Sequence, residues 1–285
     1  MTASTLKKTP AGNRRVTGKE QYYTPPALAS RLVDEVAALV PDLASRTVVE
    51  PAGGTGSFVD AASGLGCKVI SFDIEPLHKV VKAGDFLQTD VKVTDAVTIS
   101  NPPFGRNNSL SIPFFNHAAD FSEYIAFIVP RSWRKWSVLN RLDPRFHLVL
   151  DQDIEVDYQD ASGKTLSERK LLATCFQVYQ RRDVRRERVV VRDMGVVEKV
   201  APADADVALT IFGFGCGTVL TEFEPIKNTT RMFLKLKHPK ALEALRSVDF
   251  GRFSRNTAYT QALALTEINY LLNEWIFGNP HVTGL

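Results

Sequence analysis

Apolar and polar residues follow two alternating patterns along the first 180 residues, and these patterns predict helices and strands in turn. In some segments the apolar positions recur every three or four residues, as in amphipathic helices, and short β-branched runs separate these segments. The predicted helices cover residues 25–40, 57–65, 111–121 and 132–142. The predicted strands cover residues 46–50, 67–73, 95–100, 124–130, 146–151 and 171–180. Strands that alternate with helices indicate crossover connections, so we expect an α/β fold with a doubly wound, mostly parallel sheet.

The pattern changes after Gln180. Residues 181–193 are rich in arginine, and residues 194–223 are rich in glycine and β-branched side chains. An amphipathic helix is predicted over residues 260–278. We therefore expect a smaller β-rich region with closing helices. The predicted division is a flexible basic arm over residues 1–18, a first domain over 19–181 and a second region over 182–285.

Composition narrows the class of protein without fixing its function. A hydrophobic fraction of 44% is enough for a sizeable core, and the apolar runs are too short for a membrane span or a secretory signal. The three cysteines, Cys67, Cys175 and Cys216, are scattered and give no disulfide or metal-binding pattern, which fits a reducing cytoplasm. The net charge of +3 permits a nucleic-acid partner without requiring one.

A glycine-containing segment, "PAGGTGSF" at residues 51–58, follows the first predicted strand. Glycines between a strand and a helix let the backbone approach a ligand closely. A phosphate-binding loop would need Gly-Lys-Ser/Thr where Ser57 and Phe58 stand, and a dinucleotide fingerprint would need glycine where Val59 stands. S-adenosylmethionine has no phosphate and needs neither feature. A plain tight turn also remains open on this segment alone.

Two acidic residues after this segment favour an adenosyl ligand. Asp73 ends the second predicted strand, where a carboxylate can accept hydrogen bonds from ribose hydroxyls. Asp85 can accept from an exocyclic amine while the ring of the adjacent Phe86 packs on an adenine face. In this order, after the glycine segment, the two acids predict an S-adenosylmethionine site.

A rigid corner, Asn101-Pro102-Pro103-Phe104, ends the strand predicted over residues 95–100. Adjacent prolines cannot donate the hydrogen bonds of a sheet, so the strand must stop there. The segments "QYYTPPALA", "EPAGGTGSF", "FDIEP", "GDFL" and "SNPPF" together resemble the motif series of S-adenosylmethionine-dependent N6-adenine DNA methyltransferases. Their order resembles the subclass whose cofactor motifs precede the catalytic motif and whose target-recognition region comes last. The resemblance covers roughly residues 19–180, and residues 112–135 also look like a phage and viral branch.

The resemblance implies a Rossmann-like methyltransferase domain and gives the corner a chemical role. The Asn101 side-chain oxygen and the Pro102 carbonyl can accept the two hydrogens of an adenine amine, which aims the nitrogen lone pair at the methyl donor. Pro103 helps to hold this geometry, and Phe104 can stack on a flipped base. A metal ion is not expected. The three cysteines do not follow a proline, as the nucleophile of cytosine-carbon methyltransferases does, so that reaction is not expected.

The resemblance also implies a set of cofactor contacts. Glu50 is expected to accept from the cofactor's ammonium, and Phe58 to pack near the adenosyl group. Thr24 can alternatively cap the first helix. The full expected set is Tyr23, Thr24, Pro25, Glu50, Pro51, Ala52, Gly54, Gly56, Phe58, Asp73, Ile74, Asp85, Phe86 and Asn101.

Basic and aromatic residues near the corner suggest contacts with a nucleic acid, with DNA favoured over RNA. The candidates combine cations for phosphate contact with an indole for stacking: Arg106, Arg131, Trp133, Arg134 and Lys135. The arginines of residues 181–188 are equally well explained as a solvated surface. An RNA N6-adenine methyltransferase is the alternative, and a catalytically silent nucleic-acid-binding subunit is a third possibility.

Overall fold

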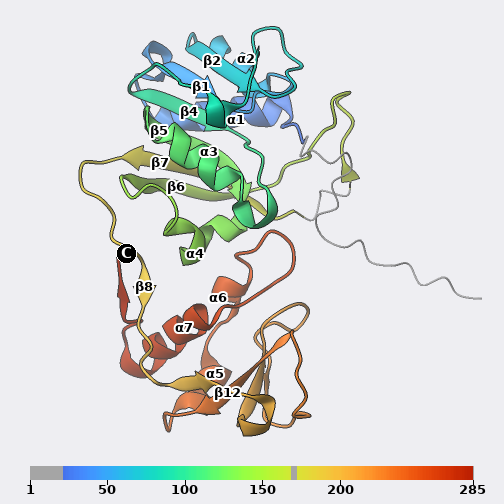
Figure 1. The fold of residues 1–285 in the computed structure, drawn as a ribbon, viewed down its shortest axis with the longest axis vertical. Coiled ribbons are helices and arrows are strands. Elements are labelled where there is room, and N and C mark those ends of the chain that lie inside the picture. The colour runs from blue at the N-terminus through green and yellow to red at the C-terminus, as the bar shows by residue number, and fades with distance from the viewer. Residues whose placement is uncertain (1–21, 168–171, 285) are drawn as a thin grey trace, which may run out of the picture.

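The computed structural model describes residues 22–167 and 172–284 and divides them between two bodies (Figure 1). The predicted arm over residues 1–18 lies outside the described residues. The first body is built on one sheet and the second on a smaller sheet with its own helices. Among the described residues, none of the helices has both the length and the apolar character needed to cross a bilayer.

Seven strands form the sheet of the first body, in the order β3-β2-β1-β4-β5-β7-β6. The strands are β1 (Thr47–Glu50), β2 (Lys68–Asp73), β3 (Lys82–Ala83), β4 (Ala96–Ser100), β5 (Ser122–Pro130), β6 (Phe146–Ile154) and β7 (Thr174–Arg181). Strand β7 runs antiparallel to both of its neighbours, and the other pairings are parallel. This order with one antiparallel strand is the Rossmann-like fold of class I methyltransferases, so the predicted fold class is confirmed.

Helices cover both faces of this sheet. One face carries α1 (Pro26–Leu39) and α2 (Ser57–Gly64), and the other carries α3 (Ser111–Ala118) and α4 (Trp136–Leu139). Successive side chains of a strand point to opposite faces of the sheet, so each strand contributes to the hydrophobic core on both faces. In β5, Ile125 and Phe127 pack on the α3 side, whereas Ala126 packs on the α1 side. The sheet therefore lies in the middle of a three-layer domain.

The helix predicted over residues 132–142 is the main error in this domain. A 3₁₀ turn, η4 (Arg131–Arg134), is followed by an extended Lys135 and then by the short α4. Trp133 is 1% exposed and packs edge-to-face against Phe115, and its indole N–H donates to Ser111 Oγ at 3.3 Å. Burial of this large ring fixes the turn and overrides the local helical pattern.

The second body has a four-stranded antiparallel sheet in the order β11-β10-β12-β9. Its elements are β9 (Val197–Lys199), β10 (Val207–Thr210), β11 (Val219–Leu220), β12 (Arg231–Leu236), α5 (Ala241–Ser247), α6 (Gly251–Ser254) and α7 (Leu265–Phe277). A two-stranded ribbon pairs β8 (Val190–Val191) with β13 (Val282–Thr283), so residues near the end of the chain pack on the connection between β7 and β9. A separate hydrophobic core gathers strands and helices of this body.

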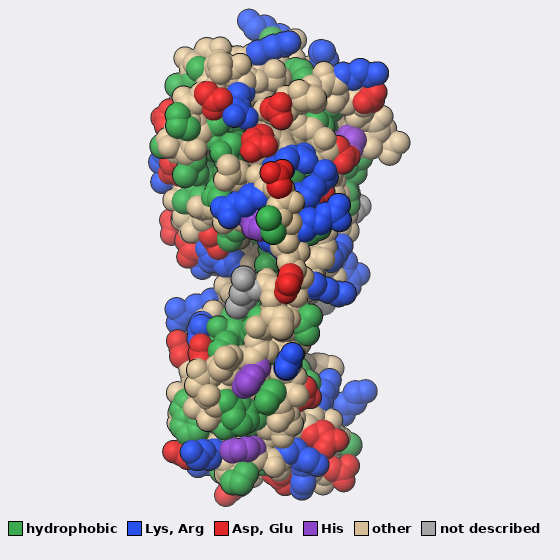
Figure 2. Space-filling view, turned by 90° about the vertical axis from the view of Figure 1, so that its left-hand side faces the viewer, with side chains coloured by type: hydrophobic (Ala, Val, Ile, Leu, Met, Phe, Trp, Pro, Cys, Tyr) green, Lys and Arg blue, Asp and Glu red, His purple; other side chains and the backbone are tan. Residues whose placement is uncertain are grey.

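The two bodies meet at a narrow junction (Figure 2). Lys135 Nζ lies 2.8 Å from Glu267 Oε1 of α7, and the Glu267 side chain is only 4% exposed. Beside this ion pair the ring of Trp136 stacks on Tyr270, with centroids 5.5 Å apart. The junction is therefore small but includes a buried charge pair and an aromatic contact.

Candidate active site

A cavity of about 390 Å³ lies where β1, β2 and β4 end. This volume falls in the range of small-molecule sites, roughly 300–1,000 Å³. It lies at the carboxyl ends of parallel strands, where open α/β sheets bind ligands. Its walls come from segments far apart in the sequence: Tyr22, Tyr23, Pro51, Ala52, Asp73, Ile74, Gly84, Asp85, Phe86, Leu87, Asn101, Pro102, Pro103, Phe104, Leu110, Phe114 and Tyr158.

The Asn101 corner forms one part of the wall and follows directly from β4. Asn101 Nδ2 donates to the backbone oxygen of Tyr22 at 3.1 Å. This bond holds the amide with its nitrogen toward Tyr22, so the side-chain oxygen remains available as an acceptor. All four corner residues, from Asn101 to Phe104, line the cavity.

Asp73 lies at the end of β2 and is both a cavity wall and a support for the glycine segment. Its Oδ2 accepts from the backbone N–H of Gly54 at 2.8 Å, and its Oδ1 accepts from that of Glu75 at 2.8 Å. Burial raises the pKa of this carboxyl, and the Gly54 bond partly offsets the effect. The carboxylate is thus fixed in orientation before any ligand binds.

Asp85 and Phe86 form the neighbouring wall. Asp85 Oδ1 accepts from the N–H of Leu87 at 3.0 Å and so caps η2 (Phe86–Gln88). The Phe86 ring is 1% exposed and lies 5.2 Å from that of Phe114, centroid to centroid. Phe86 is therefore a firmly packed part of the cavity wall.

Residues 22–25 form a strap that ties three parts of the site together. The strap pairs with the segment after β6 through two bonds of 3.0 Å between the backbones of Tyr23 and Gln159. The backbone oxygen of Thr24 accepts from Ser57 Oγ at 2.7 Å, which joins the strap to the glycine segment. The Tyr23 ring covers Gly54: a Cβ added there would lie 2.5 Å from Cε1 of Tyr23. Gly54 also has φ +47°, a backbone conformation that favours glycine. Glycine is therefore needed here both for the turn and for the close approach of the Tyr23 ring.

Glu50 ends β1 but is 1% exposed and is not among the cavity walls. Its Oε1 accepts from Ser100 Oγ at 2.5 Å and from the Ala52 N–H at 3.0 Å. Burial raises the pKa of Glu50 to about 8, against the lowering effect of these two bonds. In this arrangement the carboxyl joins β1, the glycine segment and β4 behind the cavity, and the expected contact with an ammonium would require movement.

Several other expected cofactor residues also lie outside the cavity walls. Phe58 is 5% exposed within the α1–α2 core, and Pro25 precedes α1 as its N-cap. Thr24 makes no side-chain cap, which corrects the alternative of a helix cap, and its Oγ1 is buried with no partner among the described residues. Gly56 adopts φ +89° at the start of α2. These residues shape the loop without lining the cavity.

Sequence reasoning missed several cavity walls. Tyr22 lines the cavity and is adjacent to Tyr23 in the segment "QYYTPPALA". Its position beside an expected site residue is the sequence signal that could have identified it. Phe114 looked like an ordinary core residue of α3, and Tyr158 lies in a connection without a recognisable pattern. Tyr158 is 2% exposed, and its ring packs edge-on to Tyr22 at 6.0 Å. Only the fold brings these residues to the corner.

The basic residues expected to bind nucleic acid are mostly engaged within the protein. Arg131 pairs with Asp153 at 2.9 Å, and Arg134 pairs with Asp151 and Asp153, each at 2.7 Å. Lys135 holds Glu267 at the junction. Trp133, in the core, is out of reach of a nucleic acid, which corrects its expected stacking role. Arg106 is exposed in η3 (Arg106–Asn108), just after the corner, and stays available for a phosphate contact.

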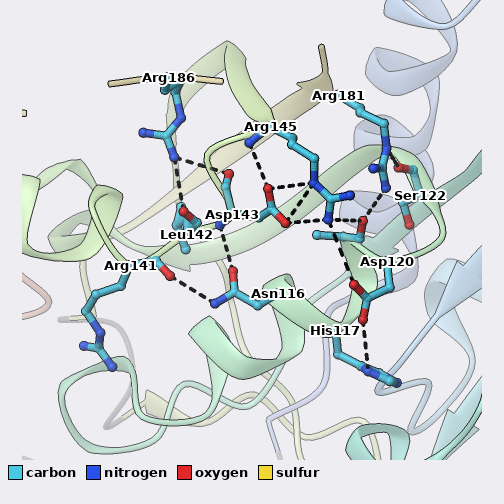
Figure 3. A network of polar contacts seen from close by, with 11 residues as sticks. Asn116, His117, Asp120, Ser122, Arg141, Leu142, Asp143, Arg145, Arg181 and Arg186 are labelled. Carbon is cyan, nitrogen blue, oxygen red and sulfur yellow. Dashed lines mark hydrogen bonds and ion pairs between the residues drawn. The ribbon is translucent and has the colours of Figure 1, made fainter. Parts of the chain in front are cut away.

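The arginine run after β7 lies at the opposite end of the strands from the cavity, because β7 is antiparallel. Arg181 Nε donates to the Ser122 oxygen at 2.8 Å, and Arg186 Nη2 donates to the Leu142 and Asp143 oxygens, each at 3.4 Å (Figure 3). Arg186 Nε also donates to the Phe146 oxygen at 2.6 Å. The nearby Arg145 pairs with Asp143 at 2.6 Å. Arg186 fastens the segment after β7 to the first domain, whereas Arg181 and Arg145 bond within that domain. Three members of the run are exposed: Arg182, Arg185 and Arg188.

Comparisons with known proteins give distant structural similarity only. The chain matches no protein-family model and no curated protein sequence. A candidate RNA methyltransferase from Pyrococcus horikoshii is similar at TM-score 0.45 and 19% identity, over 57% of this chain and 87% of that one.

Two further structures show the same level of similarity. TrmN from Thermus thermophilus gives TM-score 0.40 and 18% identity over 55% of this chain and 49% of its own. The modification subunit of a candidate type I restriction enzyme from Vibrio vulnificus gives TM-score 0.40 and 14% identity over 56% of this chain and 44% of its own. The chain is thus distantly similar in structure to proteins described as methyltransferases, and its substrate must be argued from its own site.

Proposed function

We propose that this protein transfers a methyl group from S-adenosylmethionine to the exocyclic N6 amine of adenine in a nucleic acid, with DNA as the favoured polymer. The observation that carries the proposal is the shared cavity. Asp73, Asp85 and the Asn101 corner line one space, although they follow three different strands or loops. An adenosyl donor and an acceptor amine need this proximity for direct transfer.

The side chains around the cavity fit the adenosyl donor. Asp73 offers fixed carboxylate oxygens to ribose hydroxyls, and Asp85 offers an acceptor to the adenine amine. Ile74, 66% exposed, and Phe86 line the cavity and give the apolar surfaces that an adenine ring needs. The donor supplies a sulfonium methyl group, whose transfer needs no covalent enzyme intermediate.

The corner prepares the acceptor amine. An adenine amine is a poor nucleophile because its lone pair is conjugated with the ring. The Asn101 oxygen and the Pro102 carbonyl accept hydrogen bonds from the two N–H groups of this amine. These bonds favour a tetrahedral nitrogen with its lone pair free. The Tyr22 carbonyl keeps the Asn101 amide in the orientation this requires. Phe104, at the cavity wall, can stack on a base withdrawn from its helix.

The second body supports a polymer substrate, and we propose it as the target-recognition region. Residues 182–285 include a second sheet with its own core, attached beside the first domain. In the family that the motifs resemble, a region in this position reads the target sequence. The resemblance of residues 112–135 to a viral branch keeps RNA adenine as the second candidate. A silent subunit is less favoured because Asn101 and both acids are present and share one cavity.

The test is an assay with methyl-labelled S-adenosylmethionine and four separate acceptors: duplex DNA, single-stranded DNA, total RNA and a protein extract. Digestion and mass spectrometry then identify the modified unit. We expect N6-methyladenine from DNA. Label in RNA adenine alone would move the assignment to the second candidate. Label in protein alone, or in no acceptor while the donor still binds, would contradict the proposal.

A further inference from the structure

Phe214 is the most exposed large hydrophobic side chain among the described residues. It occupies the connection between β10 and β11 and is fully exposed, at 107% of its reference surface. Gly213 and Gly215 flank it with φ +86° and +75°, and a Cβ at Gly213 would meet nothing within 4 Å. The chain therefore holds one aromatic ring at a tip with no flanking side chains. We call residues 212–217 the finger.

The base of the finger is well ordered by hydrogen bonds. The Gly213 N–H donates to the Gln261 oxygen at 3.0 Å, and the Leu263 N–H donates to the Ile211 oxygen at 2.9 Å. The Gly217 N–H closes the turn by donating to the Thr210 oxygen at 2.8 Å. A side chain at Gly217 would clash with Phe250, since its Cβ would come within 2.9 Å of that residue's Cβ. Because these bonds hold the base of the finger in place, the Phe214 ring projects from a fixed position.

Residues 258–262, which pair with the finger, also contact the first domain. The Ala258 oxygen accepts from the Ala173 N–H at 2.8 Å, directly before β7. Four residues on, the Ala262 oxygen lies 3.5 Å from Lys135 Nζ. The Ala173–Ala258 bond lies at the carboxyl end of β5, because the next residue, Thr174, pairs there with Pro130, and the cavity lies at the same edge of the sheet. Residues 258–262 thus connect the finger to the edge of the candidate active site.

The surroundings of the ring indicate what would cover it. Exposed polar side chains lie on the segment that pairs with the finger, at Thr260 and Gln261, and on the loop next to it, at Lys227 and Asn228. Two further apolar side chains, Phe212 and Ile226, are exposed in the finger and the neighbouring loop, at 49% and 64%. A protein-docking surface needs a broad apolar centre, whereas one projecting ring at a narrow tip fits the slot between two stacked bases. Stacking on an aromatic side chain is tolerant of sequence, so it suits a residue beside the target rather than one that reads it.

We propose that Phe214 inserts between stacked bases next to the target and helps to open the helix for base withdrawal into the cavity. This inference rests on the proposed function, because it presumes a nucleic-acid substrate. It adds an interaction surface on the second body, about the finger and residues 258–262, that contacts the polymer beside the catalytic corner. The chemistry is shared by DNA and RNA helices, and the test separates the two.

The experiment compares Phe214→Ala, Phe214→Trp and, as a control at an exposed ring outside the finger, Phe277→Ala; Phe277 ends α7 and is 41% exposed. Each full-length protein is titrated with mixed-sequence duplex DNA, single-stranded DNA and total RNA, and methyl transfer to each polymer is measured. We expect Phe214→Ala to lower kcat/KM about 10-fold or more with unchanged affinity for S-adenosylhomocysteine. Phe214→Trp should stay active, and its added fluorescence should be quenched by the polymer that is methylated.

Two results separate failure of this inference from failure of the proposed function. If wild type methylates a polymer, Phe214→Ala does so at the same kcat/KM and Phe214→Trp is not quenched, the inserted ring is ruled out and the reaction stands. If Phe214→Trp is quenched by DNA or RNA but wild type methylates no polymer, the nucleic-acid surface stands and the reaction is ruled out. Loss of activity in Phe277→Ala equal to that in Phe214→Ala would also overturn a specific role for Phe214.

Discussion

At the residue scale, Glu50 links the strands behind the cavity and makes stability depend on pH. Burial raises its pKa from 4.5 to about 8, so the folded state binds this proton more tightly than the unfolded state. The resulting stabilisation is complete below about pH 4.5 and is lost as pH rises toward 8. Over that window the free energy of unfolding should fall by up to about 1.4 kcal/mol per pH unit from this group.

Glu50→Gln should remove this dependence. A Gln oxygen can still accept from Ser100 and Ala52, but the side chain cannot ionise. Urea unfolding between pH 5 and 8 should show the variant gaining stability on wild type as pH rises. Glu187→Gln, at an exposed carboxylate, is the control and should track wild type. Parallel curves for wild type and Glu50→Gln would show that the carboxyl is ionised in the folded protein.

The residues of the candidate site were predictable from sequence where local order determines their place. Asp73 ends β2 and Asn101 follows β4, both predicted strands of a parallel sheet, so one edge collects them. Asp85 was predicted from its place in the motif series, since no strand was predicted before it. Burial was not predictable: Trp133 and Glu50 look like functional side chains in sequence, yet each is 1% exposed. Neighbours from distant segments decide burial, and a local pattern does not contain them.

At the element scale, the strap over the glycine segment is the feature with the most direct consequence for ligand binding. Gly54→Ala would place a Cβ 2.5 Å from the Tyr23 ring and must displace the strap. We expect calorimetry to show at least a ~10-fold loss of affinity for S-adenosylhomocysteine, in line with about 1.4 kcal/mol of lost contacts. Adding Tyr23→Ala to Gly54→Ala should recover part of the loss by removing the clash.

The control for this pair is Gly163→Ala. Gly163 also has a positive φ, +84°, but a Cβ there meets nothing within 4 Å. Its replacement carries similar backbone strain without the clash, so ligand affinity should stay near that of wild type. Affinity in Gly54→Ala equal to that in Gly163→Ala would mean that the strap does not close on the glycine segment.

Most elements of the first domain follow from sequence because their apolar periods are clear and their ends carry prolines or glycines. Helix α1 begins at Pro26, and β4 ends before the two prolines of the corner. The prediction of a helix over residues 132–142 was wrong because burial of the Trp133 indole, a tertiary contact, fixes a 3₁₀ turn there. The small strands of the second body, such as β11 with two residues, are held by their partners rather than by their own composition.

At the scale of the whole molecule, the Lys135–Glu267 pair ties the two bodies together. Glu267 also accepts from the Ala264 N–H at 2.8 Å, at the start of α7. Lys135→Met would leave a nearly buried carboxylate without its cation, so we expect a loss of about 3–5 kcal/mol in urea unfolding. Lys135→Met combined with Glu267→Gln should regain much of this, because the remaining amide is neutral.

The matched control is a second lysine ion pair on the surface. Lys235 lies 2.7 Å from Asp206, and both side chains are more exposed, at 46% and 33%. Lys235→Met should cost only about 0–1 kcal/mol. If Lys135→Met costs no more than Lys235→Met, the junction does not depend on its charge pair, and the finger would lose one of its links to the first domain.

The central claim, that the Asn101 corner transfers a methyl group to an adenine amine, is tested most directly by a single-turnover reaction. Wild type and Asn101→Ala are each preloaded with methyl-labelled S-adenosylmethionine and mixed with excess DNA or RNA, and N6-methyladenine is measured over time. We predict rapid label in the wild-type product and a reaction about 10²–10³-fold slower in the variant, since one of the two acceptors for the amine N–H groups is gone. Donor binding should be retained in both. Equal rates in the two proteins, or no N6-methyladenine from donor-loaded wild type, would contradict the claim.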